Sequence, residues 1–225
     1  AIQTSLVGSE MCIRDRPISA TALAESGLFA GSAFMMGWLG HLELAAHGIV
    51  LQLAAISFMV HLGLSQAGTV RVGQAFARGD WVAVKRTAAV TMGLSTLAAV
   101  IAIFFFLATP QMLISAFLDV EDLLAPDILR IGTLLLIVAA MFQFVDAAQV
   151  VALSLLRGLQ DTKMPMLIAA VSYWLIGLPI SYVLGFSMDY KETGIWLGLV
   201  FGLGVAAVLL WVRFSVLTRG THGRA

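Results

Sequence analysis

The sequence predicts an all-α integral membrane protein in which six helices cross the bilayer. Of the 225 residues, 60% are hydrophobic and 12% are charged, whereas a soluble domain has about 45 to 50% apolar and about 25% charged residues. Six stretches also reach the roughly 20 mostly apolar residues that a helix needs to cross a hydrocarbon core about 30 Å thick. The interruptions between them are short, so no linker divides the chain into domains.

The first three helices are predicted at residues 18–39, 44–69 and 87–107. The first contains a carboxylate, Glu25, and two glycines four residues apart, a spacing that suits close packing against another helix. The second is unusually polar and includes His47 and His61. Hydrogen bonding between helices, or placement at the membrane interface, is favoured over a proton relay for these histidines, although histidine titrates near neutral pH. The third is almost entirely apolar.

The last three helices are predicted at residues 128–156, 164–186 and 194–217. The fourth contains Asp146, and the fifth contains Gly177 and Pro179, which can free backbone groups and bend a helix. The sixth begins with three glycines spaced four residues apart from Gly194 onward, which predicts a packing ridge. Across the chain, tryptophan and tyrosine mostly fall near span ends, as residues that anchor helices at the membrane interface do; they are Trp38, Trp81, Trp174, Tyr190 and Trp196.

Residues 1–16 are set apart from the six predicted helices. The stretch SLVGSEMCIRDR, residues 5–16, resembles translated sequencing-adapter read-through, and it lacks the long apolar core of a secretory signal. A natural cytoplasmic linker is the alternative. The only cysteine is Cys12, so the chain has neither an internal disulfide framework nor paired cysteines spaced for zinc. We expect residues 1–16 to be a non-native leader and residues 17–225 to form the membrane-spanning part of the chain.

The basic residues predict the orientation, because lysine and arginine in short loops favour the cytoplasmic side. Nine of them lie at the even-numbered loops and the C-terminal end, and two lie on the opposite side. The nine are Arg71, Arg78, Lys85, Arg86, Arg157, Lys163, Arg213, Arg219 and Arg224, and the two are Arg130 and Lys191. Both ends of the chain are therefore predicted to face the cytoplasm. The chain lacks the strongly basic surface that nucleic-acid binding would require, because its net charge is zero.

Glu25 and Asp146 are the only carboxylates inside the predicted spans once the end turns are excluded. A charge at the bilayer centre costs about 2.5 to 3.5 kcal/mol on insertion scales, so such residues usually face a cavity or a partner. Burial disfavours an ionised carboxylate and a nearby cation favours it. Each acid is predicted to hold H⁺ or Na⁺ and to release it to a cationic substrate. The alternative is that each only hydrogen-bonds to a neighbouring helix.

Side chains three or four positions from Asp146 share its helix face. They include Phe142, Gln143 and Gln149. Two amides and an aromatic ring suit a cavity that receives an aromatic cation through hydrogen bonds and cation–π contact. These three are candidate cavity-lining residues, although a lone aromatic such as Phe142 more often packs against lipid or core. No metal site is expected beyond Na⁺ at Glu25 and Asp146.

Four long stretches of this sequence resemble a known family. They are LAAHGIVLQLAAISFMVHLGLSQAGTVRVGQAFARGD, FQFVDAAQVVALSLLRGLQDTKMPM, SYWLIGLPISYVLG and GIWLGLVFGL, and they look like the second six-helix lobe of a bacterial multidrug and toxic compound extrusion (MATE) antiporter. The resemblance runs from Pro17 to near the C-terminus. It implies one lobe of a twelve-helix exporter in the bacterial inner membrane, surrounded by lipid and without a cofactor other than its coupling ion. Such an exporter exchanges inward H⁺ or Na⁺ for outward cationic, lipophilic compounds.

The resemblance also assigns residue roles, because Glu25 and Asp146 fall where the family has carboxylates associated with cation coupling and substrate binding. Phe142 and Gly48 stand where many members have tyrosine and glutamine, so two possible oxygen ligands are lost. Because Na⁺ needs several oxygen ligands, this loss slightly favours H⁺ as the coupling ion, and Na⁺ stays the alternative. One lobe supplies only one wall of the cleft. We therefore expect this chain to need the N-terminal lobe, which it lacks, and to be inactive alone.

Other functions compete with this one. A lipid-linked oligosaccharide flippase of the related fold should place arginine or lysine in its cavity to meet pyrophosphate, whereas the basic residues here are predicted at span ends or in the leader. A non-catalytic membrane scaffold would have no site of its own. An enzyme is not expected, because the sequence contains neither an H-E-x-x-H metal motif nor a G-x-S-x-G nucleophile elbow.

Overall fold

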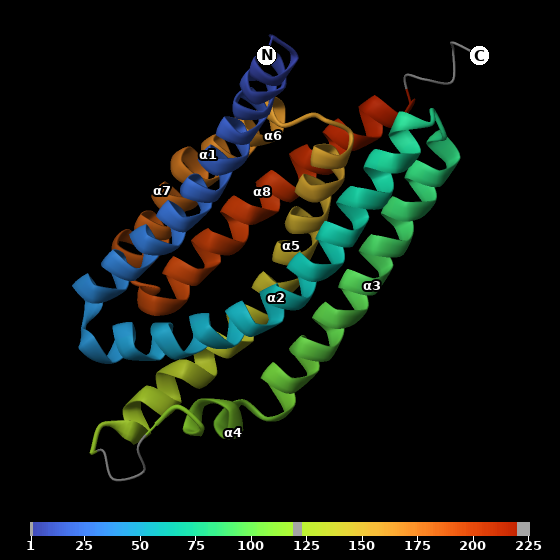
Figure 1. The fold of residues 1–225 in the computed structure, drawn as a ribbon. Coiled ribbons are helices and arrows are strands. Elements are labelled where there is room, and N and C mark those ends of the chain that lie inside the picture. The colour runs from blue at the N-terminus through green and yellow to red at the C-terminus, as the bar shows by residue number, and fades with distance from the viewer. Residues whose placement is uncertain (1, 119–122, 220–225) are drawn as a thin grey trace.

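The computed structural model describes the backbone of residues 2–118 and 123–219 and the side chains of residues 16–118 and 123–219. In this part of the chain every regular element is helical (Figure 1). In chain order the elements are α1 (Ile2–Leu39), α2 (His41–Ala77), α3 (Trp81–Ala108), α4 (Pro110–Ser115), α5 (Ala125–Gly158), α6 (Lys163–Ala170), the π-helix η1 (Val171–Gly177), α7 (Leu178–Tyr182), the π-helix η2 (Val183–Ser187) and α8 (Lys191–Arg219).

The all-α membrane fold is confirmed, but one predicted span differs from the others. Within the described ranges, five helices are long and apolar enough to cross a membrane, namely α2, α3, α5, the continuous segment 163–187 and α8. Residues 18–39 do form a helix, as part of α1, but that helix is not among the five. Its glutamate, serines and glycines make it less apolar. Five of the six predicted spans are therefore long and apolar enough to cross a membrane.

Helix α5 lies at the centre of the bundle, where it packs against α2, α3, α4 and α8 (Figure 1). Half of the most apolar window is buried in both α5 and α8, compared with 22% in α3. Helices α1 and α2 diverge from their junction, and the segment 163–187 packs against α1 and α8. The start of α1 and the end of α8 lie at the same end of the bundle.

The glycine ridge predicted in the sixth helix lies against the segment 163–187. A Cβ atom on Gly202 would lie 2.8 Å from the Cα of Gly177, and one on Gly194 would lie 2.7 Å from the backbone nitrogen of Gly185. Carbon and nitrogen atoms cannot approach so closely without displacement of the backbone. The absence of side chains at these positions therefore allows the two helical segments to touch.

The segment 163–187 is one rod with two π-helical parts. Pro179 has no N–H, so the carbonyl four residues earlier lacks its normal α-helical partner. The wider hydrogen-bond pattern of the π-helix η1 ends at Gly177, immediately before the turn that contains this proline. The predicted irregularity at Gly177 and Pro179 is thus accommodated within a continuous helix.

Local capping determines the tight turn between α2 and α3. Gly79 has a left-handed φ of 71°, which glycine adopts without steric cost. The Asp80 carboxylate accepts a hydrogen bond of 2.9 Å from the Ala83 N–H and so caps α3. This turn places the last residues of α2 beside the first residues of α3.

Candidate functional site

A cavity of about 570 Å³ lies between α1, α2 and α5. Most of its wall is apolar or aromatic, and three charged side chains interrupt it: Glu25, Asp146 and Arg157. The remaining lining residues are Ala22, Ser26, Phe29, Leu51, Ala54, Ala55, Phe58, Leu62, Phe142, Val150, Leu153 and Ser154. The structure thus brings together, in one cavity, the two carboxylates that the sequence singled out.

Asp146 is the more deeply buried of the two acids, because it sits on the central helix. The residue is 1% exposed, and neither carboxylate oxygen has a hydrogen-bond partner among the described residues. An ionised carboxylate in such surroundings is costly unless a proton or a cation neutralises it. The geometry therefore suits a group that exchanges one positive charge for another.

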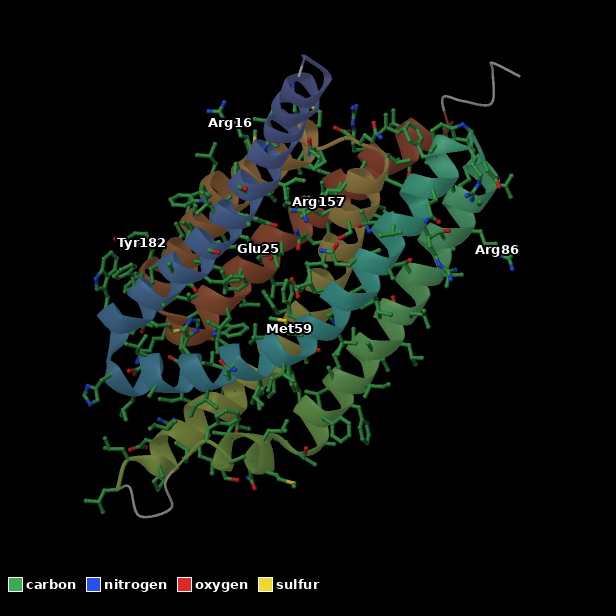
Figure 2. The ribbon with its side chains drawn as sticks, viewed as in Figure 1. Arg16, Glu25, Met59, Arg86, Arg157 and Tyr182 are labelled. Atoms are coloured by element: carbon green, nitrogen blue, oxygen red, sulfur yellow. The ribbon has the colours of Figure 1, made fainter. Side chains whose placement is uncertain are left out.

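Glu25 faces the same cavity from α1 and is half-buried. Arg157 reaches the cavity from the last turn of α5, which continues to Gly158 and so extends past the predicted end of the fourth helix. Figure 2 shows Glu25 and Arg157 toward the middle of the bundle, while Arg16, Arg86 and Tyr182 lie on its outside. The expectation that basic residues keep to span ends holds for the position of Arg157 in the chain, but its side chain lines the cavity.

The candidate lining residues separate into two groups. Phe142 lines the cavity, whereas Gln143 and Gln149 are fully buried and do not line it. Phe142 and Val150, four positions to either side of Asp146, share the cavity face with it, while the two glutamines are covered by the protein interior.

The buried glutamines enter a polar layer behind the cavity. The Gln149 amide Nε2 donates a hydrogen bond of 2.7 Å to the Tyr173 hydroxyl of η1. The Gln149 carbonyl oxygen and both polar atoms of the Gln143 amide have no partner among the described side chains and backbone. Sequence reasoning missed Tyr173, because nothing local distinguishes it from the neighbouring Trp174, which is 50% exposed.

A chain of aromatic rings leads from the cavity wall into the core. Ring centroids lie 6.0 Å apart for Phe29 and Phe142, 5.5 Å for Phe142 and Trp196, and 5.6 Å for His47 and Trp196. The Trp196 indole N–H donates a hydrogen bond of 3.1 Å to His47 Nδ1. Trp196 is completely buried, so the expectation that it anchors the helix at the membrane interface is wrong.

His47 and His61 of α2 each connect this helix to a neighbouring helix, which is one of the two roles that the sequence favoured over a proton relay. His47 contacts α8 through Trp196, and His61 Nδ1 lies 2.9 Å from the Ser95 hydroxyl oxygen of α3. Such hydrogen bonds hold neighbouring helices together in lipid, where apolar contact alone gives little driving force.

A multi-pass helical bundle with two carboxylates in one largely apolar cavity is typical of a membrane transporter. The chain belongs to the MatE family, whose model matches residues 17–183. This confirms the family suggested by the sequence, and the family is one of transporters rather than enzymes. With five apolar helices and bacterial relatives, the chain is a multi-pass membrane protein.

Two similar relatives are each named "Probable multidrug resistance protein NorM". The protein from Agrobacterium fabrum is 44% identical over 203 residues, and that from Rhizobium meliloti is 43% identical over 203 residues. Each alignment covers 90% of this chain and 44% of the relative. The chain thus spans less than half the length of these relatives.

The fold also resembles solved structures. The crystal structure of a eukaryotic MATE transporter superposes with a TM-score of 0.82 at 17% identity, over 92% of this chain and 46% of that one. A MATE crystal structure in the bent conformation gives a TM-score of 0.81 at 14% identity. At such identities the likeness concerns the fold alone, which is that of one lobe of the MATE architecture.

Proposed function

We propose that this chain forms one lobe of a secondary active multidrug exporter, in which Glu25 and Asp146 exchange H⁺ or Na⁺ for cationic, lipophilic compounds. The observation that carries the proposal is the single cavity that both carboxylates line, in which the two oxygens of Asp146 are buried without a partner. The relatives' name, multidrug resistance protein, supports drugs as the substrates.

Charge neutralisation accounts for the coupling. Asp146 is buried and has almost no contact with the water that would stabilise a bare carboxylate, so it needs a proton, a metal cation or a cationic guest. A guest and a coupling ion that neutralise the same oxygens displace each other. Phe29, Phe58 and Phe142 supply aromatic faces that attract lipophilic cations. Exchange at one site then links the inward flux of ions to the outward flux of drug.

Transport also requires a second wall. The cavity opens between diverging helices, and the relatives are about twice as long as this chain. We propose that a further lobe faces this one, that the chain alone does not transport, and that the assembled protein lies in the bacterial inner membrane. The start of α1 and the end of α8 lie at the same end, which together with the basic residues supports the placement of both on the cytoplasmic side.

Arg157 gives the flippase alternative a specific basis, because a cationic side chain does line the cavity. Two carboxylates share that wall with a single guanidinium, so the cavity carries an excess of negative charge when both acids are ionised. An anionic pyrophosphate would meet two carboxylates there and is disfavoured. The charge balance therefore favours a cationic guest.

Neutralisation of Asp146 tests the proposal. We expect Asp146→Asn, in the full-length polypeptide that contains this lobe, to abolish exchange of a fluorescent cationic dye against an ion gradient in membrane vesicles, with unchanged protein level. Asp127→Asn is the matched control, because Asp127 lies on the same helix but is exposed. Dye exchange at the wild-type rate in the Asp146 variant would contradict the proposed role.

A further inference from the structure

A second groove lies on the outside of the bundle between α2 and α3, near the turn that joins them. Its volume is about 570 Å³, and it shares no lining residue with the carboxylate cavity. An inference drawn from it is therefore independent of the proposed transport function. The groove has a polar end and an apolar end.

Two arginines, one from each helix, form the polar end. Arg71 lies six residues before the end of α2 and Arg86 lies five residues after the start of α3, so at 1.5 Å per residue both are about 8 to 9 Å from the turn. Both are exposed, and no described carboxylate forms an ion pair with either of them. The nearby Asp80 carboxylate instead caps α3.

The apolar end continues along the same two helices toward the middle of the span. Leu64 of α2 and Val90 and Leu94 of α3 line it, and the two α3 residues are about half-exposed. Leu64 is seven residues from Arg71 and Leu94 is eight from Arg86, so this part is about 10 to 12 Å long. That length accommodates a large part of one acyl chain.

The floor of the groove is closed by contact between the helices. A Cβ atom on Gly68 would lie 2.8 Å from the Thr91 hydroxyl oxygen, and both residues are buried. The groove is therefore a surface channel rather than a path into the bundle.

We propose that this groove binds an anionic phospholipid, with its phosphate between Arg71 and Arg86 and one acyl chain along Leu64, Val90 and Leu94. Complementarity selects this occupant, because arginine forks match phosphate oxygens and the leucine and valine side chains match a hydrocarbon chain. Basic pockets between membrane helices are a recurring site for anionic headgroups. A soluble anion gains nothing from the apolar end, and a lipid without net charge gains less from the arginines.

Native mass spectrometry of the full-length polypeptide in detergent tests this assignment by titration with phosphatidylglycerol. We expect Arg71→Gln together with Arg86→Gln to weaken binding about 30-fold, or about fivefold per arginine. The control pair Arg78→Gln and Lys163→Gln removes the same charge outside the groove and should change binding less than twofold. Phosphatidylcholine should bind the wild type weakly, and glycerol phosphate, which lacks acyl chains, should not bind.

A third variant tests the apolar end without altering the arginines. Ala67 is exposed and lines the groove, so Ala67→Phe should obstruct the acyl chain and weaken phosphatidylglycerol binding even if the double arginine variant folds poorly. Unchanged lipid affinity in this variant would overturn the proposal. The proposal would also be overturned if the arginine pair and the control pair lost equal affinity for phosphatidylglycerol, or if the wild type bound phosphatidylglycerol and phosphatidylcholine equally well.

Discussion

Replacement of Gly198 by alanine should destabilise the lobe, because this glycine is the point where α8 touches the segment 163–187. A Cβ atom built on Gly198 meets the backbone nitrogen and Cα of Ser181 at overlapping distance. These are main-chain atoms, so no side-chain rotation can relieve the overlap. The Ser181 hydroxyl also donates a hydrogen bond of 3.0 Å to the Ile195 carbonyl at this contact, and separation of the helices would break it.

The magnitude follows from two opposing effects. Overpacking of a close contact costs about 1 to 3 kcal/mol, and loss of the Ser181 hydrogen bond adds about 1 kcal/mol. Alanine in place of glycine within a helix returns about 0.5 to 1 kcal/mol. The net free energy of unfolding should therefore fall by roughly 1 to 3 kcal/mol.

Gly204 provides a matched control on the same helix. A Cβ atom there would meet only the Val145 Cγ1 at 3.7 Å, an ordinary van der Waals distance. Gly204→Ala should thus leave stability unchanged or increase it by up to about 1 kcal/mol. Thermal unfolding of both variants in the same detergent measures the difference. If Gly198→Ala unfolds at the same temperature as Gly204→Ala or higher, the packing argument is refuted.

Three further predictions concern the cavity and its surroundings. In vesicles, a pH gradient without sodium should drive dye exchange, whereas a sodium gradient at equal pH should not. The reason is that Phe142 and Gly48 supply no side-chain oxygen to coordinate Na⁺. The opposite result would assign Na⁺ as the coupling ion. Arg157→Gln should lower the dye concentration for half-maximal transport, since it removes a tethered cation from the cavity of Glu25; an increase in that concentration would show that Arg157 helps to hold the guest. Trp196→Phe should cost about 1 to 3 kcal/mol, because it leaves both buried ring nitrogens of His47 without a partner. Thermal unfolding checks this loss, and an equal loss in a His47→Ala background would attribute it to ring packing instead.

Much of the membrane architecture follows from composition alone. In lipid the backbone must satisfy its own hydrogen bonds. Long apolar stretches therefore form helices regardless of how the other helices are arranged around them. The same solvent makes an ionisable residue conspicuous, which is why Glu25 and Asp146 could be selected without a structure. The glycine spacing likewise indicated a packing ridge before its partner was known.

Tertiary packing decided how each helix is rotated about its own axis. Hydrophobicity shows little periodicity when both lipid and core are apolar, so the sequence could not tell buried Trp196 from Trp38, which is 70% exposed. For the same reason it did not separate Phe142, on the cavity wall, from Gln143, behind it. The placement of Arg157 beside Glu25 required the course of α5 relative to α1. The sequence by itself determined which residues enter the membrane and which of them are unusual there, whereas contacts between helices decided which side chains share a cavity.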